Sequence, residues 1–132
     1  MAKKFNFTVK VYYEDTDAGG VVYYANYLKF LERARSEAIY SLDYTNSSLL
    51  ETFGVLLIVK SCNIEYKKPA KFEDKLVVIS EVQSFTKTSF LMKQSILRNN
   101  EIITDAEVHL VSVDKNGKPS KLPDELKEKL EN

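Results

Sequence analysis

Residues 12–30, YYEDTDAGGVVYYANYLKF, join a strand pattern to a helix pattern, with two acids and two glycines at the junction. Before the junction, residues 7–13 alternate, which predicts a half-buried strand with one apolar face: Phe7, Val9, Val11 and Tyr13. From about Ala25 the spacing becomes helical, with one apolar stripe: Tyr27, Phe30, Leu31, Ala34, Ala38 and Leu42. The stretch therefore predicts a strand followed by a long helix.

The remainder of the chain is mostly strand-like. Ser48 and Glu51 have capping-box spacing, which predicts a short second helix ending near Gly54. Asn99-Asn100 favours a hairpin turn, residues 114–117 favour a second turn, and a short helix with Leu126 and Leu130 as its apolar stripe follows Pro123. Four strands are expected: Val55–Tyr66, Lys75–Phe85, Ser89–Leu97 and Ile102–Val113.

This order, with helices early and an antiparallel sheet after them, predicts a single α+β domain over residues 1–132. Residues 55–59, VLLIV, and 76–79, LVVI, place apolar side chains on both faces of the sheet. One long helix covers only one face, so we expect a second subunit against the other.

Composition excludes several classes of function. Nineteen basic and nineteen acidic residues cancel, so no global field favours nucleic acid or an anionic membrane. No apolar run reaches the length of a signal peptide core or a membrane span, and we expect a cytoplasmic protein. Cys62 is the only cysteine, which excludes an internal disulfide and a zinc site of the Cys/His type.

The acids and glycines of residues 15–20, DTDAGG, allow three interpretations. A calcium loop is rejected, because Gly19 and Asn26 stand where such a loop requires an oxygen ligand and a bidentate glutamate. An ordinary turn with a helix cap accounts for the residue types but not for their concentration. A reaction centre accounts for both, because unpaired N–H groups at a helix start can hold an oxyanion while a nearby carboxylate attacks or activates water.

Residues 11–37, VYYEDTDAGGVVYYANYLKFLERARSE, resemble the opening motif of hotdog-fold acyl-CoA thioesterases of the 4-hydroxybenzoyl-CoA thioesterase type, including the Tol-Pal-associated branch. Weaker similarity, through IEYKKPAKFEDKLVV and KTSF, extends to about Val113. The resemblance implies a hotdog fold, in which a curved antiparallel sheet wraps a long helix in a homodimer or homotetramer. It also implies hydrolysis of an acyl-CoA thioester, with coenzyme A as part of the substrate and no other cofactor and no metal.

The resemblance also implies residue roles. Asp17 matches the catalytic carboxylate, and the backbone N–H of Tyr24 matches the donor that polarises the thioester carbonyl. Asp15 matches a position that holds the loop by hydrogen bonds to backbone. The expected substrate-binding residues are Tyr23 beside the helix start, Lys87 for the coenzyme A phosphates, and Thr88 and Ser89 for the pantetheine. The chain departs from the Tol-Pal branch at Tyr24, where many members have histidine, so it lacks an imidazole there.

Other polar residues have simpler interpretations. Lys67, Lys68 and Lys71 are expected to form a solvated strand end, and His109 to have a surface or packing role. Cys62 is expected to be a small core residue. The alternative to an enzyme is a module that binds an acyl thioester or acyl carrier without turnover, which would not require Asp17. Hydration or dehydration of acyl chains is disfavoured, because the single histidine is far in sequence from the acids.

Overall fold

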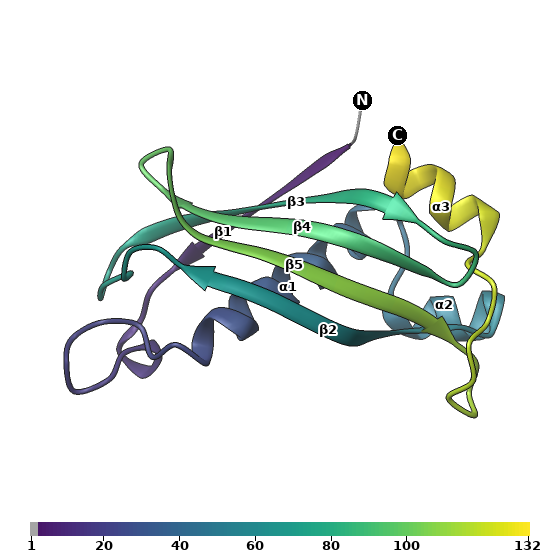
Figure 1. Cartoon of the computed structure of the whole chain (residues 1–132), viewed down its shortest axis with the longest axis horizontal. Helices are drawn as coiled ribbons and strands as arrows, with labels where there is room; N and C mark the ends of the chain where they lie inside the picture. Colours follow the sequence, from purple (N-terminus) through teal and green to yellow (C-terminus); the bar gives the residue numbers. More distant parts are fainter. Residues whose placement is uncertain (1–2) are drawn as a thin grey trace.

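The computed structural model describes residues 3–132 (Figure 1). In this part of the chain the strands are β1 (Lys4–Lys10), β2 (Leu56–Tyr66), β3 (Lys75–Phe85), β4 (Ser89–Arg98) and β5 (Glu101–Val113). The helices are α1 (Asn26–Ser41), α2 (Asn46–Phe53) and α3 (Asp124–Glu131), with a 3-10 turn, η1 (Tyr13–Asp15).

The strands form one antiparallel sheet in the order β1-β3-β4-β5-β2. Its register defines two ends. Lys10, Lys75 and Tyr66 lie at one end, where β1 continues towards η1. Leu56 and Ser89 lie at the other, beside the last residues of β5. The α+β prediction is confirmed, and the long helix against an antiparallel sheet is the hotdog fold.

The long helix α1 covers one face of the sheet and packs mainly against β1 and β3, behind the sheet in Figure 1. Its predicted apolar stripe is buried throughout. Phe30 and Leu31 are fully buried with Leu76, Val78 and Ile96 of the sheet. Each such side chain contributes about 1.5–3 kcal/mol by leaving water, so this stripe holds the helix in place.

Gln94 is a fully buried polar residue beneath α1, and both ends of its side-chain amide are hydrogen-bonded. Its side-chain amide donates to the carbonyl of Leu31 and to the hydroxyl of Ser80, both at 3.0 Å. Its oxygen accepts a 3.0 Å hydrogen bond from Arg35. These bonds join the middle of α1 to the middle of the sheet.

The two short helices close the end of the sheet that carries Leu56. Leu49 of α2 and Leu126 and Leu130 of α3 are buried in a second apolar cluster. The predicted stripe of the last helix is confirmed. The capping box of α2, however, is formed by Thr45 and Ser48, one turn earlier than predicted. Thr45 is extended and its hydroxyl accepts the Ser48 N–H, so the helix begins at Asn46.

The first strand lies three residues earlier than the alternation predicts, at Lys4–Lys10 and not at residues 7–13. It ends at Lys10, and Tyr13 lies in η1, where its side chain is 76% exposed and stacks on Phe72. The prediction that Tyr13 belongs to the buried strand face is wrong. The Asp15 carboxylate accepts the Tyr12 N–H at 2.9 Å and turns the backbone out of the sheet.

Strand β2 forms an edge of the sheet, and most of its side chains are exposed. Four large apolar side chains of this strand are among the exposed ones: Leu56, Ile58, Val59 and Tyr66. Cys62 is also exposed, so the prediction that it is a core residue is wrong. The reason is its place on an edge strand, whereas α1 packs mainly against β1 and β3.

Candidate active site

The Asp17 loop is a small hairpin between η1 and α1. Thr16 pairs with Val22, the Asp17 N–H donates to the Val21 carbonyl at 2.9 Å, and the Gly20 N–H donates to the Asp17 carbonyl at 3.0 Å. One carboxylate oxygen of Asp17 accepts the Gly19 N–H at 2.8 Å. The residue is exposed, and within residues 3–132 its second oxygen accepts no hydrogen bond. The turn thus orients the carboxylate from one side and leaves its other side available.

The first acid of the motif has the structural role expected of it. Asp15 is buried, and its carboxylate accepts the Tyr12 N–H. Its carbonyl accepts the Tyr23 N–H and the Asn26 side-chain amide, both at 2.9 Å. These bonds join η1 to the start of α1 and set where the Asp17 hairpin leaves the body of the protein.

The start of α1 offers backbone donors beside this hairpin. Within residues 3–132, the N–H groups of Tyr24 and Ala25 have no hydrogen-bond acceptor. Ala25 occupies the N-cap position without a capping side chain. Such unpaired groups carry the partial positive charge of a helix N-terminus, which favours a negatively charged oxygen.

A cavity of about 250 Å³ opens at the same place. Its walls are Val22, the rings of Tyr24, Tyr27 and Tyr66, and the segment 67–69. Tyr23, the tyrosine expected to bind substrate, is 46% exposed and is not among these walls, although its ring lies 5.0 Å from that of Tyr24. Sequence reasoning missed Tyr66, whose only signal is its position as the last residue of an alternating strand.

The hairpin that carries Lys87, Thr88 and Ser89 lies at the opposite end of the sheet from Asp17. Ser89 pairs with Val111, the Thr88 carbonyl accepts the Ser112 N–H, and the Lys87 carbonyl accepts the Leu122 N–H. Lys87 is exposed. Ser89 is 6% exposed and its hydroxyl is 2.6 Å from that of Thr86. Within one chain, these residues therefore do not join Asp17 and Tyr24 in one site.

The remaining lysines near the tyrosine cavity have protein partners. Lys68 forms an ion pair of 2.6 Å with Glu101, and Lys67 lies 3.9 Å from Asp105. Lys71 pairs through its backbone with Val21. These contacts agree with the interpretation of this segment as a strand end.

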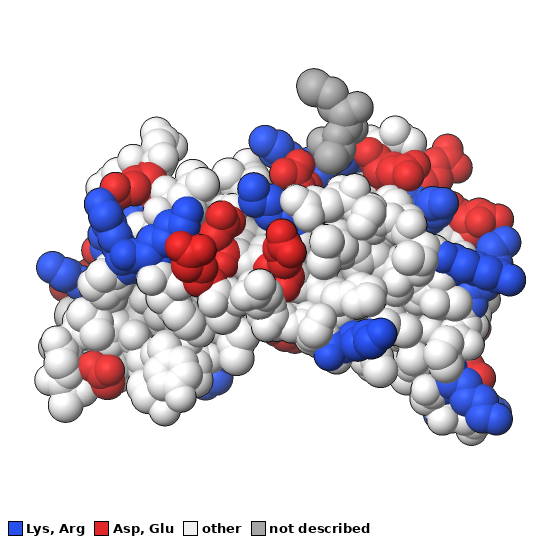
Figure 2. Space-filling model, viewed as in Figure 1, with Lys and Arg blue, Asp and Glu red and all other residues white. Residues whose placement is uncertain are grey.

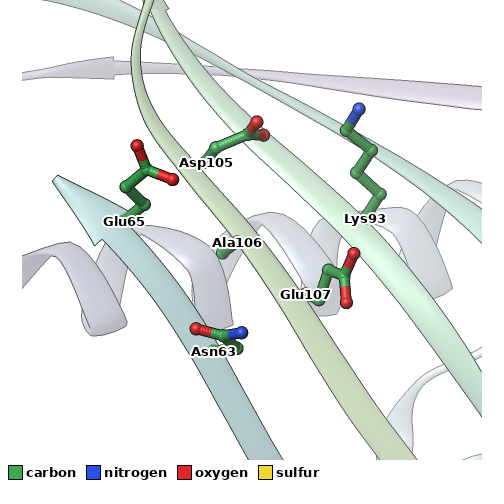
Figure 3. A pocket seen from close by; sticks show the side chains of 6 residues that line it. All are labelled: Asn63, Glu65, Lys93, Asp105, Ala106 and Glu107. Carbon is green, nitrogen blue, oxygen red and sulfur yellow. The ribbon is translucent and has the colours of Figure 1, made fainter. Parts of the chain in front are cut away.

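A second cavity, of about 180 Å³, lies on the face of the sheet away from α1 (Figure 3). Figure 3 shows acidic side chains on β2 and β5 together with Lys93 of β4, and α1 behind the sheet. Residues 3–132 contain no group of three or more histidine, cysteine or acidic side chains placed to hold a metal ion. His109 is half-buried on this face, between Leu91 and Ser61 of the neighbouring strands.

The face of the protein seen in Figure 2 carries no dominant charge. Figure 2 shows lysine and arginine interspersed with aspartate and glutamate, separated by broad uncharged areas. In the described part of the chain, none of the helices has the length and apolarity needed to cross a membrane.

The family model of the thioesterase-like superfamily matches residues 11–130. The chain belongs to this superfamily. It is 44% identical over 124 residues to the acyl-CoA thioesterase YbgC of Haemophilus influenzae. The match covers 93% of this chain and 91% of that relative. The predicted family, including its Tol-Pal-associated branch, is therefore confirmed.

Solved structures agree with this assignment. A probable thioesterase from Bartonella henselae is 31% identical, with a TM-score of 0.88, over 92% of this thioesterase-like chain and 100% of its own. A 4-hydroxybenzoyl-CoA thioesterase in complex with 4-hydroxybenzoyl-CoA is 18% identical, with a TM-score of 0.91, over 98% and 99% of the two chains. At 18% identity, the similarity to the 4-hydroxybenzoyl-CoA thioesterase concerns the fold alone.

Proposed function

We propose that the protein hydrolyses acyl-CoA thioesters to a free acid and coenzyme A, with the Asp17 carboxylate and the Tyr24 N–H as its catalytic groups. The observation that carries this proposal is an exposed carboxylate, oriented by the Gly19 N–H, on the hairpin that leads into a helix start with unpaired N–H groups. The name of the Haemophilus influenzae relative, an acyl-CoA thioesterase, supports the same reaction and substrate class.

In the proposed reaction, the thioester oxygen accepts the Tyr24 N–H at the positive end of α1. Negative charge develops on this oxygen when the carbonyl carbon is attacked, so the donor binds the transition state more strongly than the substrate. A donor of this kind contributes about 10²–10³ in rate. The C–S bond then breaks, and coenzyme A leaves as a thiolate that takes a proton from water.

Asp17 has two possible roles in this step. As a nucleophile it forms an acyl anhydride, which water then hydrolyses. As a general base it takes a proton from the water that attacks the thioester carbon. A single turnover in ¹⁸O-water separates the two roles. In the nucleophilic route, water that attacks the Asp17 carbonyl of the anhydride leaves ¹⁸O in the Asp17 carboxylate. In the general-base route, no ¹⁸O enters this carboxylate.

We propose further that the active form is a homodimer joined along the β2 edge of the sheet, and not across the face opposite α1 where the sequence led us to expect the second subunit. This strand is eleven residues long, and one of its edges has no strand partner within residues 3–132. A long free edge with exposed Ile58 and Val59 is an aggregation hazard unless another strand pairs with it. A second copy related by a two-fold axis pairs its β2 antiparallel with β2 of the first, so the free β2 edge of each copy is covered.

The dimer also accounts for the separation of the expected site residues. A strand rises about 3.3 Å per residue, so the two ends of β2 lie roughly 30 Å apart. Antiparallel pairing brings the Leu56 end of one copy beside the Tyr66 end of the other. Lys87 of the partner subunit then approaches the side of the sheet that carries Asp17, where it can bind a coenzyme A phosphate.

Release of free thiol from acetyl-, butyryl-, palmitoyl- and benzoyl-CoA tests the proposed reaction. Asp17→Asn retains the shape of the loop and removes the charge, and we expect it to lose at least about 10²-fold in kcat. Glu14→Gln is the matched control, because it neutralises an exposed carboxylate three residues away. Binding of these acyl-CoAs without turnover by the unmodified protein would instead establish a binding module. Turnover that persists in Asp17→Asn would refute the catalytic assignment.

A further inference from the structure

Tyr66 joins the end of β2 to the start of α1. Its hydroxyl donates a 3.2 Å hydrogen bond to the carbonyl oxygen of Tyr24, 42 positions earlier in the chain. The only other donor to this carbonyl within residues 3–132 is the Tyr27 N–H, at 3.3 Å. The bond therefore ties the first turn of α1 to a residue of the edge strand.

The ring of Tyr66 is held in place by two other tyrosines. It meets the ring of Tyr27 at a centroid distance of 5.2 Å and that of Tyr24 at 6.3 Å, both nearly edge to face. Tyr27 is itself rigid, because it is 3% exposed and its hydroxyl accepts the Ala70 N–H at 2.9 Å. Tyr66 is thus a link between a core side chain and the helix start.

The bonded carbonyl belongs to the peptide group that also contains the Ala25 N–H. Holding this carbonyl fixes the plane of the peptide, and therefore the direction in which Ala25 donates. Hydrogen bonds in a chain also polarise one another, so a bond to the oxygen strengthens the N–H on the other side of the same peptide. The Tyr24 N–H lies on the preceding peptide, which shares the Tyr24 Cα with the bonded one.

The hydroxyl of Tyr66 remains a donor under ordinary conditions. Partial desolvation raises the pKa of Tyr66, which is 42% exposed, and the neighbouring Cys62, Tyr27 and Tyr24 raise it further. The proton that bonds to the Tyr24 carbonyl is therefore retained at neutral pH.

We infer that Tyr66 is a positioning residue for thioester hydrolysis, acting through the Tyr24–Ala25 peptide to aim the N–H donors at the substrate oxygen. The inference rests on the proposed function, because it assigns a supporting residue to the same site. It adds Ala25 as a second backbone donor beside Tyr24. Neither residue type nor spacing in the sequence indicates this pairing.

Tyr66→Phe tests the inference, because it keeps the ring and removes only the hydroxyl. We expect kcat to fall about tenfold for the acyl-CoA with the highest kcat/KM, while KM changes less than about twofold, since the lost bond acts on the developing oxyanion. Tyr40→Phe removes a hydroxyl from an exposed residue near the other end of α1 and should retain full activity. Urea unfolding of both variants checks that the fold is retained.

The carbonyl stretch of the same acyl-CoA, bound to Asp17→Asn, gives a readout that packing alone would not move. Strong donors lower this frequency, and we expect Tyr66→Phe in the Asp17→Asn background to shift it part of the way back towards the free value. An unchanged frequency, an unchanged kcat or a change confined to KM would overturn the inference. If the unmodified protein hydrolyses none of the four acyl-CoAs, the proposed function fails, and the role of Tyr66 fails with it.

Discussion

Gly19 lies where an added methyl group would press on the proposed catalytic carboxylate. A Cβ atom at this position would lie 3.2 Å from Oδ1 of Asp17, whereas ordinary van der Waals contacts are 3.4–4 Å. The same oxygen accepts the Gly19 N–H at 2.8 Å. In Gly19→Ala the carboxylate must therefore move by a few tenths of an ångström. A misplacement of about 1 Å can cost roughly 10²-fold, so we expect kcat to fall about tenfold.

The stability of Gly19→Ala should not fall with its activity. Gly19 does not have the positive φ that makes a side chain unfavourable, and alanine lowers the entropy of the unfolded chain. We expect an unfolding free energy equal to that of the original protein or higher by up to about 1 kcal/mol. Gly117→Ala is the control. Gly117 has a φ of +81°, an added Cβ atom there would meet no atom within 4 Å, and the residue is far from Asp17 in the sequence. That variant should lose about 1 kcal/mol of stability and retain its kcat.

Thiol release and urea unfolding, measured on both glycine variants, decide the question. A kcat within twofold of the original for Gly19→Ala would show that the position of the Asp17 carboxylate does not limit hydrolysis. Equal losses of activity and stability in Gly19→Ala would show that the methyl group disturbs the whole loop. Either result would refute the reasoning from the 3.2 Å contact.

Three further predictions concern the dimer and the stability of the chain. Asp17→Asn and Lys87→Gln, mixed in equal amounts and refolded together, should recover about a quarter of the original activity, because half of the dimers are mixed and each has one intact site; no recovery would contradict a shared site. Thr45→Ala should lower the unfolding free energy by about 1 kcal/mol by removing the cap of α2, as urea unfolding would show. Burial raises the pKa of Asp74, but hydrogen bonds from the Lys71 N–H and from Arg98 lower it by more, so the pKa is below its ordinary value. The stabilisation by Asp74 is therefore present above about pH 4 and is lost as the pH falls through the depressed pKa, so Asp74→Asn should be less stable at pH 7 and approach the original in urea unfolding at pH 3.

Most of the secondary structure was predictable because local patterns agree with the fold. The strand Lys75–Phe85 has the predicted bounds, and Asn99 and Asn100 have the positive φ of a tight hairpin turn. The errors occur where side chains bond to nearby backbone. Asp15 ends the first strand early, and Thr45 starts α2 early. Periodicity does not register such bonds, because it reports burial and not hydrogen bonding.

The candidate site was predictable only in part. The acid hairpin and the helix start are continuous in sequence, so one motif contains Asp15, Asp17 and Tyr24. Tyr66 is 42 positions from Tyr24, and its contact exists only after β2 has paired with β5 and Tyr27 has packed beneath it. Residue spacing along the chain holds no information about such a contact.

The sequence by itself determined the elements, their order and the carboxylate loop, because each depends on interactions within about ten residues. It also indicated the superfamily, through the motif around Asp17. Only the tertiary structure decided that Cys62 is exposed, that Tyr66 bonds the start of α1, and that Lys87 lies at the far end of the sheet from Asp17. These facts follow from strand order and register, which depend on long-range pairing of the backbone and on which face the helix covers.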